Sequence, residues 1–191
     1  PVTLASGKSL AGFATGTISM PNTASDVATS GTGAISLTTA TNVTMLSGSS
    51  LTTVDGALTV NANQQVTPTA GNFNGVNVNA ATIQSTGTGI ATVNGKGGTS
   101  GGGQQGVLVI SGAIIRGGNA AGITTSVNGT GGAATGPTNL GVVVTNGSAS
   151  ITSIGGNVSV IGIAGSGTGG DHHGVRVFNA ASISAGSSGT V

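Results

Sequence analysis

The chain has 191 residues, enough for one domain with a sizeable core, and only 4% of them are charged, giving a net charge of +1. So few charges provide no basic surface for nucleic acid, and the absence of Trp and Tyr removes the usual platforms for base stacking. Apolar residues make up 36% and are mainly small or β-branched, which argues against disorder and favours strands over helices. No apolar run approaches the ~18 residues of a membrane helix, so no membrane span is expected in this segment.

Residues 1–74 carry short and irregular repeats. Alternating apolar residues follow a glycine in GAISL from Gly33 and in GALTV from Gly56, with GTISM from Gly16 as a candidate third copy. Gly33 precedes Gly56 by 23 residues, and Gly56 precedes Gly75 by 19. Because Gly75 opens a longer repeat, we interpret these segments as shortened copies of the strand that begins there.

Residues 75–191 contain long repeats with three markers in constant order. The first is a GVxV segment, which begins at Gly75, Gly106, Gly141 and Gly174, at spacings of 31, 35 and 33 residues. The second is a short strand around Ile83, Ile114 and Ile115, Ile151 and Ile183. The third is a VxGxGG-like segment that begins at Val93, Val127 and Val160, in each case 13 or 14 residues before the next GVxV segment. This constant order identifies a true internal repeat.

Three short strands per repeat, separated by Gly, Asn and Ser turns, predict a single all-β domain over 1–191, a parallel β-helix. We expect a right-handed solenoid with about three strands per rung. A β-sandwich would not explain the constant order of the markers.

The predicted rungs stack equivalent side chains into inward columns. The sequence predicts one inward column of Val76, Val107, Val142 and Val175, a second of Val78, Val109, Val144 and Val177, and a third of Val93, Val127 and Val160. Val143 is expected to point outward, at a position that tolerates a charge unless that face is an interface. Asn146 and Asn179, with Ser111 at the same offset, suit a left-handed corner and could stack as a polar ladder.

The repeat GVxV, then A-x-I, then VxGxGG with a loop rich in Gly, Ser, Thr and Asn, resembles bacterial surface β-solenoids. These are the filamentous-haemagglutinin-like and autotransporter-passenger-like adhesins. The resemblance is best over residues 75–191 and looser over 16–74, and it rests on repeat style rather than on a diagnostic motif. It implies a secreted or cell-surface rod that acts as stalk, adhesin or fibre, and it implies no functional residues.

The stretch from Gly165 to His173 is the one place where acid and imidazole side chains gather. Aligned by the repeat, it corresponds to residues 97–105 and 131–139, so Asp171, His172 and His173 replace Gly103, Gln104 and Gln105. Asp and His suit Zn²⁺ or Ni²⁺. Adjacent residues on an extended loop rarely converge on one ion, and the equivalent loops offer no further ligand. We therefore interpret this stretch as a polar turn, with Asp171, His172 and His173 only a weak metal-site candidate, and we expect no cofactor.

The sequence lacks the residues that several other functions would require. A calcium-binding solenoid needs an Asp in every turn, and polysaccharide processing needs paired carboxylates, whereas Asp26, Asp55 and Asp171 fall in different rungs. The glycine-rich runs lack the Lys-Ser/Thr ending of a phosphate-binding loop. A regular row of outward-facing threonines on successive rungs could bind ice. The outward positions of the GVxV strands are instead Asn77, Leu108, Val143 and Arg176. The sequence thus predicts no enzyme activity.

The leading hypothesis is a structural segment of an extracellular or cell-surface fibre. The alternative is a module that binds carbohydrate or a host surface on its long-loop side, with ice binding and polysaccharide processing ranked lower. Neither end of the sequence shows a cap, and uncapped rungs expose unpaired strand edges. We therefore expect head-to-tail self-association into a filament, or continuation in a longer chain.

Overall fold

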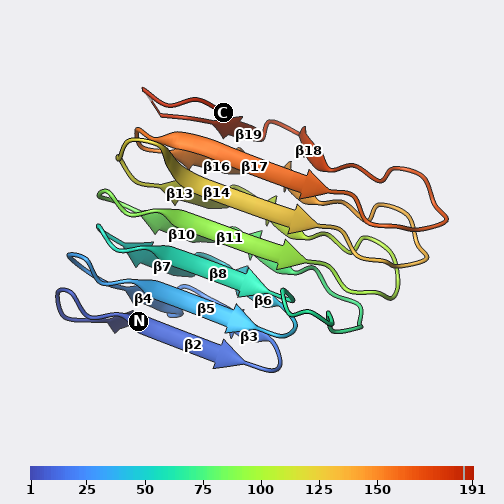
Figure 1. Cartoon of the computed structure of the whole chain (residues 1–191), viewed down its shortest axis with the longest axis horizontal. Coiled ribbons are helices and arrows are strands. Elements are labelled where there is room, and N and C mark those ends of the chain that lie inside the picture. Colours follow the sequence, from blue (N-terminus) through green and yellow to red (C-terminus); the bar gives the residue numbers. More distant parts are fainter. Residues whose placement is uncertain (187) are drawn as a thin grey trace.

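The computed structural model describes residues 1–186 and 188–191 and shows a β-solenoid built from three parallel sheets (Figure 1). Among these residues there is no helix. Sheet A contains, in spatial order, β1 (Val2–Thr3), β4 (Asp26–Ala28), β7 (Ser50–Thr53), β10 (Thr82–Ser85), β13 (Ile114–Gly117), β16 (Ser150–Ser153) and β19 (Ser182–Ser184). Sheet B contains β2 (Leu10–Ala14), β5 (Ile35–Thr39), β8 (Leu58–Ala62), β11 (Ala91–Lys96), β14 (Ile123–Thr130) and β17 (Asn157–Ile163). Sheet C contains β3 (Ile18–Met20), β6 (Val43–Leu46), β9 (Val76–Asn79), β12 (Val107–Ile110), β15 (Val142–Thr145) and β18 (Val175–Phe178).

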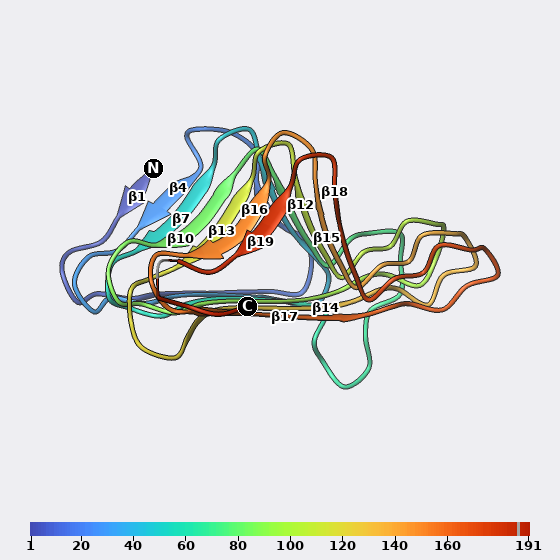
Figure 2. The ribbon, with the colours of Figure 1, turned by 90° about the horizontal axis from the view of Figure 1, so that it is seen from above.

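The chain visits the three sheets in the order A, B, C and then begins the next rung. Every strand pairs in parallel with the strand three places along the chain, so each rung lies directly on the one before it. Figure 2 looks down the stack and shows sheet B as the long flat side, with the loops that lead from sheet B to sheet C extending beyond it. The predicted all-β parallel solenoid with about three strands per rung is confirmed.

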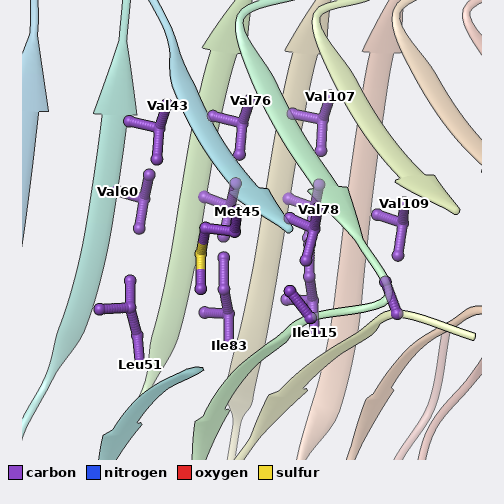
Figure 3. Close-up of a cluster of buried hydrophobic side chains, with 14 of the residues drawn as sticks. Val43, Met45, Leu51, Val60, Val76, Val78, Ile83, Val107, Val109 and Ile115 are labelled. Carbon is purple, nitrogen blue, oxygen red and sulfur yellow. The ribbon is translucent and has the colours of Figure 1, made fainter. Parts of the chain in front are cut away.

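The core is a set of apolar columns that run through the stack, as predicted. Val76, Val107 and Val142 are in register in sheet C and fully buried, and Val175 continues their column. Sheet A supplies Ile83, Ile115 and Ile151 to the same interior, and sheet B supplies Val60, Val93 and Val127. Figure 3 shows side chains from all three sheets meeting in this interior. β-branched residues suit it because they fill the narrow space with few rotamers.

The two glycine markers recur because they touch each other. Gly129 belongs to the VxG segment of β14, and a Cβ added to it would lie 2.1 Å from the carbonyl oxygen of Gly141, which opens the next GVxV segment. Gly95 and Gly162 meet the carbonyls of Gly106 and Gly174 in the same way. Side chains larger than hydrogen would force the two strands apart. The constant spacing of the markers thus has a steric cause.

The prediction for the N-terminal repeats was wrong in one respect. The GAISL and GALTV segments do not continue the GVxV strand, because Ile35 pairs with Leu58 and Leu58 with Ala91, all in sheet B. The GVxV column is continued instead by Val43 and by Ile18 of the GTISM segment. Glycine followed by alternating apolar residues describes any strand of this solenoid, so the pattern alone could not select the sheet. The rungs are indeed shorter here.

Val143 also departs from the prediction. It alternates with the inward Val142 and Val144, as expected for an outward residue, but only 4% of its surface is exposed. Its register neighbours in the flanking strands are Leu108 and Arg176. The valine is thus shielded from water even though it faces outward. An outward register therefore does not make this position tolerant of a charge.

The corner after each GVxV strand is left-handed, as predicted. Asn146, Asn179 and Ser111 have φ angles of 61°, 54° and 60°. The Asn179 Nδ2 donates to the Asn146 Oδ1 at 2.9 Å, which forms the expected polar ladder between two successive rungs. Short polar side chains are the residues that best tolerate this backbone conformation outside glycine.

Candidate functional site

The loops from sheet B to sheet C form a second stack beside the core. Gly103, Thr138 and Asp171 all have positive φ, so the three loops turn at the same point. The backbone N–H of Gln104 donates to the Asn139 Oδ1 at 3.1 Å, and the backbone N–H of Asn139 donates to the His172 Nδ1 at 3.2 Å. His172 therefore takes the place of Gln104, as predicted. Asn139 occupies the equivalent position in the middle loop. Measured from the paired glycines Gly95, Gly129 and Gly162, the first loop is one residue shorter than the other two.

Asp171 is the centre of a small exposed charge cluster. Its Oδ1 lies 2.8 Å from the Nε2 of His173, and its Oδ2 accepts from the Nη1 of Arg176 at 2.7 Å. The Arg176 guanidinium lies over the Phe178 ring, 4.7 Å from its centroid. Asp171 and His173 come from the loop, while Arg176 and Phe178 come from β18. The cluster thus ties the loop to the strand that follows it.

The pKa of the Asp171 carboxyl is lowered by the hydrogen bond to His173 and then by the one to Arg176. The pKa of Asp55 is also lowered, first by the backbone N–H of Thr88 and then by the hydroxyl of Thr88. In both cases the bonds favour the charged form of the carboxylate. Asp26 has a separate partner, the hydroxyl of Ser50 at 2.7 Å. Each acid therefore serves a local structural contact.

The three residues of the weak metal candidate do not converge. His172 directs its Nδ1 toward the backbone of Asn139, whereas Asp171 and His173 face each other on the exposed side. Within residues 1–186 and 188–191, no group of three His, Cys, Asp or Glu side chains is placed to hold a metal ion. The geometry that the structure shows is that of a polar turn with one ion-pair cluster.

The end of the stack formed by β17, β18 and β19 is an open apolar surface. Val175 and Val177 lie in the columns of Val142 and Val144, yet each is 40% exposed, while the residues beneath them are fully buried. A cavity of about 540 Å³ opens here, lined from all three sheets by residues that include Val160, Val175 and Ile183. The interior of the solenoid is thus accessible at this face.

The opposite end, formed by β1, β2 and β3, presents the same columns. Ile18 stands in the column of Val175, and Met20 stands in the column of Val177. Val2, in the column of Ile183, is 54% exposed. Ile18 is partly buried, and Met20 is nearly covered. The two ends therefore match in register, but of these three residues at this end only Val2 and Ile18 are accessible, whereas Met20 is covered.

Sequence reasoning anticipated unpaired strand edges at the ends, but it missed the cavity and the exposed columns as a candidate site. The signal was present in the alignment itself, because a column of inward residues must have a first and a last member.

Comparison of the chain with protein-family models, with curated proteins and with solved structures gives no significant match. In the part of the chain that the structure describes, no helix is long and apolar enough to cross a membrane.

Proposed function

We propose that the chain is a structural segment of an extracellular bacterial fibre or adhesin stalk, in which further solenoid rungs, either of a second copy or of a longer chain, stack on its two ends. The observation that carries this proposal is the register match between the two ends, because the inward columns that are exposed at β17, β18 and β19 begin at β1, β2 and β3. The bacterial and extracellular parts of the proposal rest on the resemblance of the repeat to surface solenoids. The lack of cysteine is compatible with export.

A second copy fits each open end. Placing β2 and β3 of one copy on β17 and β18 of another continues sheets B and C in their existing order. Sheet A has seven strands against six in the other two sheets, so β19 then takes the sheet A position of β1 of the second copy. Ile18 would then cover Val175, and Met20 would cover Val177. Each rung junction inside the molecule already buries such pairs, so the junction between copies would repeat an interaction that the fold uses throughout. The unpaired backbone groups of the edge strands would be satisfied at the same time.

This contact joins unlike faces, so it does not close on itself. A heterologous contact repeated along one axis produces a filament. The outer surface of such a filament would carry mostly hydroxyl and amide side chains with few charges, as the composition requires. A passive mechanical role needs no catalytic group. None is assigned here, since the three carboxylates have separate structural partners.

Assembly of the isolated chain tests the proposal. Sedimentation velocity and negative-stain electron microscopy at rising concentration should show rods that lengthen along one axis. Val177→Lys, at the open end, should block growth while circular dichroism stays unchanged. Thr135→Lys, on the exposed loop between β14 and β15 and away from the open end, is the matched control and should leave growth intact. A chain that stays monomeric at high concentration, or a Val177→Lys variant that still grows, would contradict end-to-end stacking.

A further inference from the structure

We propose that a groove on the outer face of sheet B, between Phe13 and the loop that connects β8 to β9, binds a neutral saccharide. The groove has a volume of about 610 Å³, within the usual range for small-ligand sites. Strands β2, β5, β8 and β11 form its floor, and the loop forms its wall. Figure 2 shows this loop, in blue-green, projecting away from the plane of sheet B, unlike the equivalent loops of the later rungs.

The floor is a file of outward residues at regular spacing. Phe13 pairs with Thr38, Thr38 with Asn61, and Asn61 with Asn94. Neighbouring strands lie about 4.8 Å apart, so Phe13 and Asn61 are separated by about 9.6 Å along the stack. This separation is comparable with the length of two linked pyranose rings. The floor can therefore contact two consecutive sugar units.

The wall is held in place by a buried side chain. Asn63 is fully buried with a φ of 59°, and its Oδ1 accepts from the backbone N–H of Thr69 at 2.7 Å. The same oxygen accepts from the Nε2 of Gln65 at 2.9 Å, and that Nε2 also lies 2.9 Å from the carbonyl oxygen of Ala40 in the floor. Because the loop is anchored before a ligand arrives, binding needs little additional ordering.

The groove retains polar groups that point to a polyhydroxylated ligand. Asn61 accepts from the Nδ2 of Asn94 at 2.7 Å. In the hydrogen-bond network of the described residues, the Nδ2 of Asn61, the Oε1 of Gln65 and the hydroxyl of Thr38 make no bond. They offer a donor, an acceptor and a group that is both. Sugar hydroxyls can pair with all three.

The remaining features of the groove select for a neutral sugar ring. Its lining has no charged side chain, so it provides no counter-charge for an ionic ligand. Phe13 is 79% exposed and offers an apolar ring at the mouth of the groove. The C–H faces of a pyranose are apolar, while its rim carries the hydroxyls, so one ligand satisfies both the ring and the amides.

Fluorine NMR of the full chain labelled with 4-fluorophenylalanine can test this site, because the chain has only three phenylalanines. Phe13→Leu assigns the Phe13 signal. The probes are the neutral hexasaccharides of cellulose, chitin, starch and xylan, with hexagalacturonate as the acidic comparison. At least one neutral hexasaccharide should shift the Phe13 signal saturably, with a dissociation constant of about 1 mM or tighter. The signals of Phe73 and Phe178 should stay in place.

Variants separate this site from non-specific contact. Asn61→Leu and Gln65→Leu should each weaken the interaction at least about tenfold, because each loses a direct hydrogen bond to the sugar. Val66→Thr, on the exposed outer part of the loop and outside the groove lining, should bind like the parent chain. An unchanged Phe73 signal checks that the loop region keeps its fold.

Three results would overturn the proposal. One is a silent Phe13 signal with every neutral hexasaccharide at about 10 mM. Another is an equal response to hexagalacturonate, and the third is unchanged affinity in both leucine variants. A response to an apolar peptide in place of all the sugars would assign the groove to a protein partner instead.

Discussion

Val142 and Val175 occupy the same place in successive rungs, in register and with the same inward direction. Val142 is fully buried, whereas Val175 is 40% exposed. Neither residue type nor local backbone separates the two positions. The difference is that Val142 has a rung on both sides and Val175 has a described rung on one side only. In a solenoid, the burial of a side chain is decided by its neighbours along the stack.

The largest expected effect comes from comparing a charge at two positions of one inward column, one between two rungs and one at the end of the stack. Val144→Asp would bury an unpaired carboxylate between two rungs, which we expect to cost at least about 4 kcal/mol and to prevent stable folding. Val177→Asp, one rung further along, leaves the carboxylate in contact with water and should fold. Urea unfolding followed by circular dichroism at low protein concentration measures both. Similar losses at the two positions would show that the end rung is not open.

A second comparison concerns the contact between the glycine markers. Gly129→Ala places a Cβ against the Gly141 carbonyl, a backbone atom that cannot move without shifting the rung, so we expect a loss of about 3 kcal/mol. Gly170→Ala is the control, because a Cβ there has no atom within 4 Å. It should change stability by less than about 0.5 kcal/mol. If the two variants melt at the same temperature, the steric explanation for the repeat is wrong.

Truncating the two valines gives a smaller and graded effect. Val142→Ala removes two buried methyl groups and leaves a cavity between rungs, at a cost of about 2 kcal/mol. Val175→Ala should cost less than about 1 kcal/mol in the dilute chain, because much of the side chain is already exposed. Chemical denaturation supplies both values. A larger loss of stability for Val175→Ala than for Val142→Ala would contradict the conclusion that burial depends on the neighbouring rungs.

The smallest effect concerns pH. The pKa of Asp171 is lower in the folded chain than in the unfolded chain, so its contribution is present above the unfolded value and is lost as the pH falls through the folded value. We expect only a slight fall in melting temperature on acidification, since the cluster is exposed to solvent. Asp171→Asn should remove this part of the pH dependence. If the melting temperature of the Asp171→Asn variant falls with pH as much as that of the parent chain, the pH dependence comes from other carboxylates.

The sequence alone was sufficient to predict the fold, because each rung repeats the same steric requirements. The Gly129 contact must recur in every long rung, where the sheet B strand meets the following sheet C strand, and the inward valines must recur wherever two rungs meet. Both therefore appear as regular markers. The N-terminal rungs were assigned to the wrong sheet because glycine followed by alternating apolar residues occurs in every sheet. The groove beside Phe13 could not be predicted, because it depends on one loop that leaves the common path and on the bonds of Asn63 that hold it there.

Hydrogen exchange measured by mass spectrometry at low and high protein concentration tests end-to-end stacking most directly. Exchange reports the local opening of each strand. We predict that β17, β18 and β19 exchange faster than β9, β10 and β11 when the chain is dilute. At high concentration they should become protected, together with β1, β2 and β3, while the central strands stay unchanged. Equal protection of end and central strands in the dilute chain, or no gain at the ends on concentration, would contradict the account.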